Sequence, residues 1–147
     1  MVKSLTLFFP LGLLAFLSAT HADSPGNPDD ILIIVNRAVK VDVSIQDIKE
    51  IYLKRRTRWQ MTQKVIPINA KENLEIRTDF RKRVLELSRN EENSYWQERK
   101  IKAGEEPPIT FENRIKAVFK LRGSVSYIYR HQHLKGVVRV LLVLPAK

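Results

Sequence analysis

Hydrophobic residues fall into short clusters along the chain, and their spacing separates strands from helices. The run Ile31–Asn36 is apolar up to its last residue and rich in β-branched side chains, which is typical of a strand buried on both faces. Residues 124–129 alternate in polarity and residues 137–144 are strongly apolar, so both segments predict strands. A further strand is expected over 64–69, where Pro67 has no N–H to donate and indicates a sheet edge or a bend.

The segments between the predicted strands carry helical patterns. Ser44 and Asp47 have the spacing of a capping box, with Asp in place of the usual Glu, and predict a helix over about 45–54. Asn73 is the expected cap of a second helix. The apolar face of that helix recurs at helical spacing, at Ile76, Phe80, Val84 and Leu87.

Two more helices are expected before the last strands. Asn90 is the expected cap of the third helix, which the segment 104–108 ends, and Thr110 is the expected cap of the fourth, which Arg122 and Gly123 close. The apolar residues expected to face the core are Tyr95, Trp96 and Ile101 in the third helix and Phe111, Ile115, Val118 and Phe119 in the fourth. The resulting order, β-α-β-α-α-α-β-β, predicts an α/β domain with helices packed on a sheet.

The first 22 residues have the three parts of a secretory signal peptide. Lys3 gives a positive start, Leu5–Leu17 is apolar, and Thr20 and Ala22 are the small residues that a signal peptidase reads. A membrane anchor is the alternative, but the apolar run is shorter than the roughly 20 residues that a span needs. We therefore expect a cleaved signal over 1–22, a flexible polar leader over 23–30 and one folded domain over 31–147.

Composition adds the expected compartment and the kind of partner. The sequence contains no cysteine, so neither disulfides nor the cysteine-linked lipid of bacterial lipoproteins can form, and a periplasmic protein without a stable membrane anchor is expected. The formal net charge is +10, of which the signal removes only Lys3. This charge favours an oxyanion, an acidic polymer, an anionic lipid or an acidic protein, although a solvated surface without a specific partner explains charge alone. Export argues against nucleic acid.

No catalytic constellation is present, so an enzyme is not expected and no cofactor is implied. The sequence lacks nucleophile-elbow, zinc-protease, P-loop and dinucleotide-binding patterns. His131 and His133 have the spacing of one strand face, but two ligands seldom make a metal site, and a polar turn is the plainer interpretation. Glu91 and Glu92 stand where acids complement a helix dipole.

Two segments have the chemistry to bind an anion. The first is a cationic patch beside Trp59, formed by Lys54, Arg55, Arg56 and Arg58. The second is the turn 69–73, which leads into a helix whose free N–H groups suit phosphate-like groups, with Arg77 one turn further on. An ordinary capped helix is the alternative at the second segment.

Several short pieces follow one another in an order known from a protein family. They are Val35-Asn36, 43–53, Trp59, 65–68, Arg77–Phe80, Tyr95-Trp96, Gly104, Pro107-Pro108 and 123–128. In this order and spacing the chain resembles the phosphate-binding-protein-like domain of periplasmic solute-binding proteins that serve ABC transporters. The resemblance implies a single-lobe α/β domain with a mixed sheet flanked by helices. It also implies ligand-binding positions at Asn36, Asn73, Arg77 and Thr78.

The sequence departs from that family at the ligand site itself. Family phosphate binders carry Ser-Gly-Thr before the helix, whereas this chain has Asn73-Leu74-Glu75-Ile76, and its length matches one lobe rather than two. Two hypotheses follow. The chain is either a module that binds phosphate or a similar oxyanion weakly for an ABC permease, or a periplasmic accessory or interaction protein that keeps the fold without the ligand site and has an envelope protein as its partner.

Overall fold

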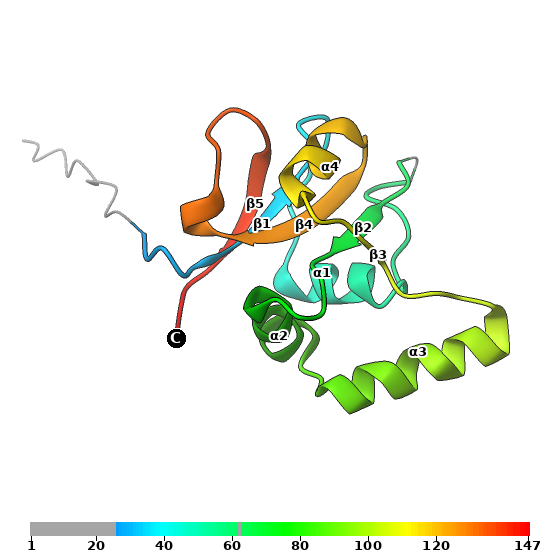
Figure 1. Cartoon of the computed structure of the whole chain (residues 1–147). Coiled ribbons are helices and arrows are strands. Elements are labelled where there is room, and N and C mark those ends of the chain that lie inside the picture. Colours follow the sequence, from blue (N-terminus) through cyan, green and yellow to red (C-terminus); the bar gives the residue numbers. More distant parts are fainter. Residues whose placement is uncertain (1–25, 62) are drawn as a thin grey trace, which may run out of the picture.

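The computed structural model describes residues 26–61 and 63–147, which build a five-stranded sheet with helices on both faces (Figure 1). The predicted signal 1–22 lies outside the described residues. In chain order the elements are β1 Ile31–Val35, α1 Ile45–Tyr52, β2 Ile66–Asn69, α2 Glu75–Phe80, α3 Arg89–Ala103, β3 Ile109–Thr110, α4 Arg114–Lys120, β4 Ser124–Tyr129 and β5 Arg139–Leu144. A π-helical turn, Arg81–Leu85, extends α2, and a 3₁₀ turn, Arg130–Gln132, follows β4. No helix in the described ranges is long and apolar enough to cross a membrane.

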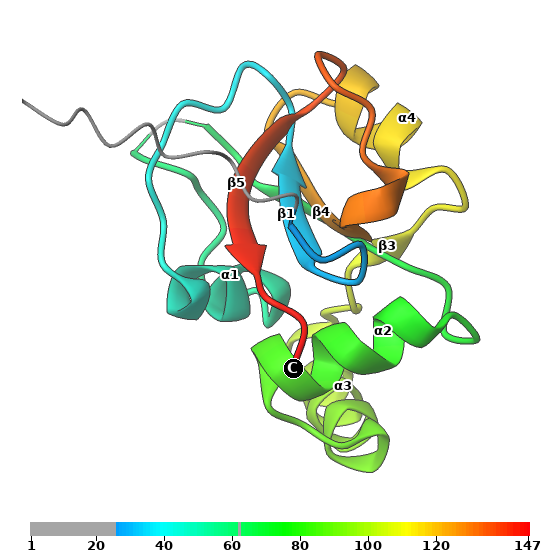
Figure 2. The same cartoon turned by 90° about the vertical axis from the view of Figure 1, so that its left-hand side faces the viewer.

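The sheet is mixed and has the strand order β3-β2-β4-β1-β5. β2 runs parallel to β3 and β4, whereas β1 runs antiparallel to β4 and β5. Figure 2 shows β5 along one edge of the sheet, with the C-terminus beside α2. The α/β class and the mixed, helix-flanked sheet that the sequence predicts are therefore confirmed.

The position of β1 inside the sheet explains why its sequence is apolar without alternation. Ile31, Ile33 and Val35 pack with α1 and α2 on one face of the sheet, while Leu32 and Ile34 pack with α4 on the other. All of these side chains are essentially inaccessible to solvent. A strand covered on both faces has no polar side, which is what the continuous run predicts.

The structure contains the capping box predicted for α1 and accommodates the proline in β2. Asp47 accepts a hydrogen bond from the backbone N–H of Ser44 (2.8 Å), and the Ser44 hydroxyl accepts one from the N–H of Asp47 (3.2 Å), so the capping box is present. Pro67 lies in a strand that is not at the sheet edge, but pairing with β3 begins only at Ile68. Pro67 therefore has a neighbouring strand on one side only, which accommodates its missing N–H.

Three predicted helix caps are wrong. In two cases a neighbouring residue is the N-cap, and in the third the chain is extended at the predicted position. The N-cap of α2 is Leu74, without a side-chain bond, and not Asn73. Ser88 caps α3 in a reciprocal box with Glu91, in place of Asn90. Thr110 belongs to β3, and Asn113 caps α4 by accepting from the N–H of Lys116 (2.9 Å).

The predicted core is confirmed for the α2 stripe and only in part for α3 and α4. Phe80 is fully buried, and Trp96 and Val118 are buried as expected. Ile101 is 79 % exposed, because the far half of α3 projects away from the sheet (Figure 1). Phe119 is 54 % exposed, because α4 packs through Ala117 and Val118 and the side chain of Phe119 points about 100° away from that of Val118. Phe111, in the loop before α4, is also exposed.

Candidate functional site: a buried ion-pair network at one edge of the sheet

The parallel strands β2 and β4 end at the same edge of the sheet, beside the start of α2. Tyr127 ties these elements together, because its hydroxyl donates to the Oδ1 of Asn69 (3.2 Å) and accepts from the N–H of Ala70 (3.1 Å). Tyr52 adds a bond from its hydroxyl to the carbonyl of Ile68 (3.0 Å). The segment that leads into α2 is thus fixed by buried hydroxyl groups on its core side.

Arg77 belongs to a network of five charged side chains at this edge, in which the exposed Arg89 joins only through Glu72 (3.4 Å). Arg77 Nη2 donates to Glu92 Oε1 (2.6 Å), and Arg81 Nε donates to Glu92 Oε2 (2.6 Å). Glu72 lies 3.4 Å from Arg77 Nε and also pairs with Arg81. Arg77 and Arg81 are four residues apart and so share one face of the helix, where Glu92 of α3 meets them.

This network neutralises the guanidinium groups within the protein. Arg77, Arg81 and Glu92 are all at most 5 % exposed. Burial by itself lowers the pKa of Arg77, but the neighbouring Tyr127, Glu92 and Glu72 outweigh it and raise that pKa above its usual value. Removing one member would leave a buried charge without its partner, so the network is a structural unit as well as a candidate site.

Two buried donors beside the network have no hydrogen-bond partner in the described part of the chain. They are Arg77 Nη1 and Trp96 Nε1. Both residues line a small hollow of about 240 Å³, which we call the Trp96 hollow and which Glu72, Asn93 and Thr110 also border. A buried donor without a hydrogen-bond partner costs free energy, so a group with acceptor oxygens would be stabilised by these two donors.

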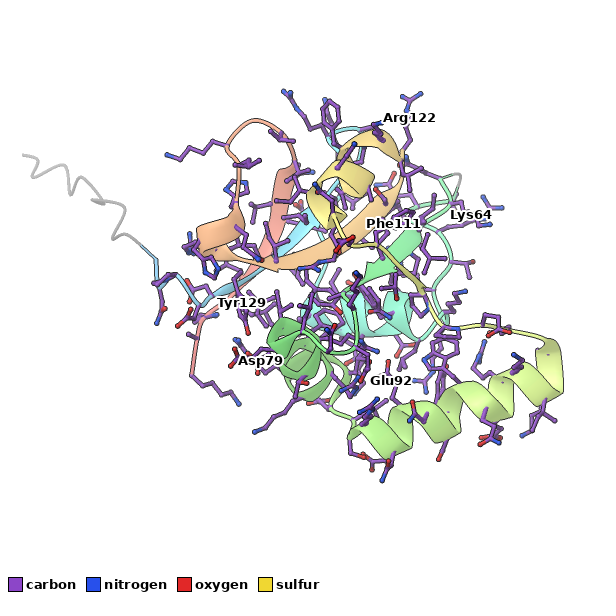
Figure 3. The ribbon with its side chains drawn as sticks, viewed as in Figure 1. Lys64, Asp79, Glu92, Phe111, Arg122 and Tyr129 are labelled. Carbon is purple, nitrogen blue, oxygen red and sulfur yellow. The ribbon has the colours of Figure 1, made fainter. Side chains whose placement is uncertain are left out.

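A larger hollow of about 690 Å³, here called the edge hollow, lies on the other side of α2. Tyr129 and Asp79 line it, and the Tyr129 hydroxyl donates to Asp79 Oδ2 (2.7 Å; Figure 3). Burial, together with this bond to a carboxylate, raises the pKa of Tyr129 well above its usual value. The remaining charged lining is mixed, with acids and bases interspersed: Asp29, Glu75, Lys82, Arg83, Arg114 and Lys147.

The structure brings together three of the four ligand-binding positions that the family resemblance implies. Asn73, Arg77 and Thr78 lie at the start of α2, but Asn73 and Thr78 are exposed whereas Arg77 is buried. Asn36 lies at the opposite edge of the sheet, where β1 ends. Its Nδ2 donates to the carbonyls of Val118 (2.8 Å) and Phe119 (2.9 Å), so its amide joins β1 to α4.

The cationic patch is partly neutralised by neighbouring carboxylates. Arg55 pairs with Glu50 (3.3 Å), and Arg56 pairs with Asp47 (2.6 Å). Arg56 also donates to the carbonyls of Arg58 and Trp59, which fixes the loop. Lys54 turns the chain after α1 with a positive φ of 53°. These contacts make the patch a structural junction with some remaining positive charge.

His131 and His133 lie in and just after a 3₁₀ turn, as the plainer sequence interpretation predicts, and not on a strand. A ring nitrogen of His131 lies 3.0 Å from the carbonyl of Pro28. Among the described residues no group of three or more histidine, cysteine, aspartate or glutamate side chains is placed to hold a metal ion.

Sequence reasoning missed Glu72, Arg81 and Glu92 as members of the network. The spacing of Arg77 and Arg81 was a usable signal, since residues four apart face the same way on a helix. Glu92 was interpreted with Glu91 as a dipole complement, but only Glu91 caps α3. The side chain of Glu92 points instead to α2, which only the packing of the two helices determines.

Comparisons with known proteins identify the fold. No protein-family model and no curated protein matches this sequence. The structure is similar to an ABC-type phosphate transport receptor from Vibrio cholerae, with a TM-score of 0.61, 18 % identity, and coverage of 77 % of this chain and 45 % of the receptor.

Two further solved structures agree. A putative phosphate ABC transporter substrate-binding protein with bound phosphate from Clostridium perfringens gives a TM-score of 0.57 at 16 % identity, covering 77 % of this chain and 44 % of that one. PstS from Borrelia burgdorferi gives 0.53 at 15 % identity, covering 68 % and 40 %. The chain therefore has the phosphate-binding-protein-like fold and spans less than half the length of each of these proteins.

Proposed function

We propose that this chain, which has the fold of phosphate transport receptors over less than half their length, is an exported periplasmic interaction or accessory module. In this proposal it keeps the solute-binding fold without the enclosed ligand site. The supporting observation is the network around Arg77, the residue expected to hold an anion. Glu92 and Glu72 already occupy its Nη2 and Nε groups, and an incoming anion would have to displace the buried carboxylate of Glu92 and the more exposed carboxylate of Glu72.

The rest of the start of α2 supports the same proposal. Leu74 caps the helix without a side-chain bond, and Glu75 places a carboxylate in its first turn, where it repels an anion. Asn36 is separated from this region by the length of β1 and satisfies its own hydrogen bonds. The described lobe by itself would also leave a bound anion partly hydrated, because it contacts the anion from one side only.

Calorimetric titration with inorganic phosphate tests this proposal on the chain that begins at Asp23. We expect either no heat or a dissociation constant of about 100 µM or weaker, equivalent to at most roughly 5–6 kcal/mol of binding free energy. The titration is repeated at moderate salt, because exposed charge pairs are screened. Sub-micromolar binding that is lost in Arg77→Lys, but kept in the α3 surface variant Lys100→Gln, would overturn the proposal.

Weak oxyanion binding on behalf of an ABC permease is the second candidate, and a specific observation favours it. Arg77 Nη1 and Trp96 Nε1 are unpaired donors at the Trp96 hollow, and two N–H groups suit two oxygens of a phosphate-like ligand. A small movement that exposed both donors would allow them to bind it. The ligand would then lie beside Trp96 and not at the exposed Asn73.

Replacing Trp96 by Phe separates the two candidates, because it keeps an aromatic ring and removes the N–H donor. If the hollow binds phosphate, the variant should bind about tenfold more weakly, the usual worth of one hydrogen bond. Gln97→Ala, on the exposed side of the same helix, is the matched control and should change nothing. Equal affinity of the Trp96→Phe variant and the unaltered chain would exclude this second candidate.

A further inference from the structure

Several segments of the chain meet at the edge of the sheet opposite the Arg77 network. Asn36 donates to the carbonyl of Phe119 (2.9 Å), and Arg37 Nη1 donates to the carbonyl of Gly136 (3.1 Å). Gly123, with φ at 81°, approaches the loop before β2 so closely that a Cβ there would collide with the carbonyl of Lys64. The end of β1, the end of α4, the loop before β5 and the loop before β2 therefore form one continuous surface.

This surface, which we call the basic pole, carries many cations and almost no acid. Its exposed cations are Arg37, Lys40, Lys64, Lys120, Arg122 and Lys135. None of them forms an ion pair with a carboxylate in the described ranges 26–61 and 63–147. No aspartate or glutamate occurs after Glu112, and the segments 31–41 and 54–71 contain none either. Asp42 is the nearest acid along the chain and lies in the loop that leads away to α1.

The charge is therefore polarised along the molecule. Most carboxylates lie on α1, α2 and α3 or beside them, where they pair with neighbouring cations such as Lys49, Arg81 and Lys102. α3 lies at the far end of the molecule from α4 and Arg122 in Figures 1 and 3. Lys120 alone would be explained by the dipole at the end of α4, but Lys64 and Lys135 lie on loops.

Two large apolar side chains stand out from the basic pole. Phe119 is 54 % exposed at the end of α4, and Leu134 is 56 % exposed in the turn before β5. The carbonyl of Phe119 is bound by Asn36, and the carbonyl of Gly136, two residues after Leu134, is bound by Arg37, so neighbouring residues hold the two segments that carry these exposed side chains. Apolar tips surrounded by lysine and arginine are the combination by which peripheral proteins hold an anionic lipid surface.

We propose that the basic pole docks on an anionic phospholipid bilayer, with Phe119 and Leu134 entering the headgroup region while the surrounding cations contact lipid phosphates. This inference rests on the proposed function as an interaction module and names the partner. It leaves the Arg77 network and both hollows facing away from the membrane. The two proposals can fail separately, since phosphate titration probes one end of the molecule and vesicle binding the other.

Vesicle co-sedimentation tests the docking surface on the chain that begins at Asp23, which keeps both hydrophobic clusters and omits the apolar run Leu5–Leu17. We expect binding to vesicles that contain phosphatidylglycerol and none to pure phosphatidylcholine, with binding that weakens as salt rises. Lys120→Gln with Arg122→Gln should weaken binding about 30-fold, since each lysine or arginine near the surface contributes about fivefold. The control with the same net charge, Lys100→Gln with Lys102→Gln on α3, should change binding less than about threefold.

A second pair of variants tests the contribution of the apolar side chains to vesicle binding. Phe119→Ser should weaken binding to the anionic vesicles about tenfold, because the ring no longer enters the headgroup region. Ile101→Ser, at a still more exposed apolar site on α3, should leave binding unchanged. Both positions are exposed, so we expect both variants to fold. Thermal melts check this.

Three results would overturn the proposal. One is the absence of binding to anionic vesicles even at low salt, and another is equal binding to phosphatidylcholine. The third is an equal loss in the α3 control, which would mean that net charge alone attracts the protein. Retention by an acidic protein that depends on Lys120 and Arg122, together with no vesicle binding, would assign the basic pole to a protein partner instead.

Discussion

Phe80 lies flat against Tyr127, with ring centroids 3.8 Å apart and ring planes 5° from parallel. This stack holds α2 against β4, and Tyr52 closes the same cluster with its ring 4.6 Å from that of Phe80. Since Tyr127 also bonds Asn69 and Ala70, the cluster fixes the loop from which α2 begins. The position of the Arg77 network therefore depends on aromatic packing one layer below it.

Replacing Phe80 by Ala should lower the free energy of unfolding by about 3–5 kcal/mol, because the side chain is fully buried and its loss leaves a cavity. Urea melts measure the change. Phe111→Ala, at a position 39 % exposed, is the control and should cost less than about 1 kcal/mol. A loss below about 1 kcal/mol for Phe80→Ala would contradict the buried stripe.

Glu92→Ala should destabilise the protein by about 3–5 kcal/mol, since it leaves Arg77 and Arg81 buried without their shared carboxylate. Glu98→Ala removes an exposed carboxylate from the same helix and should cost less than about 0.5 kcal/mol. Urea unfolding of both variants gives the comparison. Similar costs for the two substitutions would mean that the network contributes no more than a surface ion pair.

Asp30 should make stability depend on pH in the acid range. A hydrogen bond from the N–H of Ala146, helped by Arg130, lowers the pKa of Asp30 below its ordinary value of 3.8. The folded state therefore binds this proton less readily than the unfolded state, so the stabilisation is present above pH 3.8 and is lost as pH falls through the lower folded pKa.

The matching experiment compares the unaltered chain with Asp30→Asn in thermal melts from neutral pH down to about pH 2. The unaltered chain should melt at the higher temperature near neutral pH, and the difference should shrink below pH 3.8. A difference that stays constant over the whole range would show that the carboxylate charge does not cause it.

Processing of the chain should produce a mature protein that begins at Asp23. Thr20 and Ala22 are the small residues before the expected cleavage site, and a large charged residue there, as in Ala22→Arg, should block cleavage. N-terminal sequencing of the protein from the periplasmic fraction checks both statements. Recovery of the unaltered chain with Met1 retained would refute the export prediction.

The elements with strong periodic patterns could be predicted from the sequence, and their ends could be predicted less well. The alternation of faces in β1, the capping box of Ser44 and the stripe through Phe80 all follow from local spacing, which the structure confirms. Asn90 was a wrong cap because Ser88, two residues earlier, has a similar local preference. Thr110 was wrong because pairing with β2 extends the chain there, and Asn73 was wrong because α2 starts after Leu74, whose side chain makes no capping bond. The two-residue β3 gave no signal, since its pairing with β2 supplies the only reason for it to be extended.

The candidate site was predicted less well, for a different reason. The sequence placed Arg77 at the start of a helix, but it did not show that Arg77 would be buried against Glu92, which belongs to another helix. Asn36 was grouped with Arg77 through a family resemblance, and the sheet register instead places it at the other end of β1 beside α4. Both outcomes depend on contacts between residues far apart in the chain.

The sequence by itself determined the main helices and strands, the α/β class and the excess of positive charge, because these follow from the order and spacing of neighbouring residues. The tertiary structure decided which charges are neutralised and which remain free. Glu92 and Glu72 meet Arg77 and Arg81 because α2 and α3 pack together, whereas Lys120, Arg122 and Lys135 gather at a pole that no acidic segment reaches. Electrostatic pairing acts over a few ångströms in space and not along the chain, so only the folded structure could separate the paired charges of the network from the free charges of the basic pole.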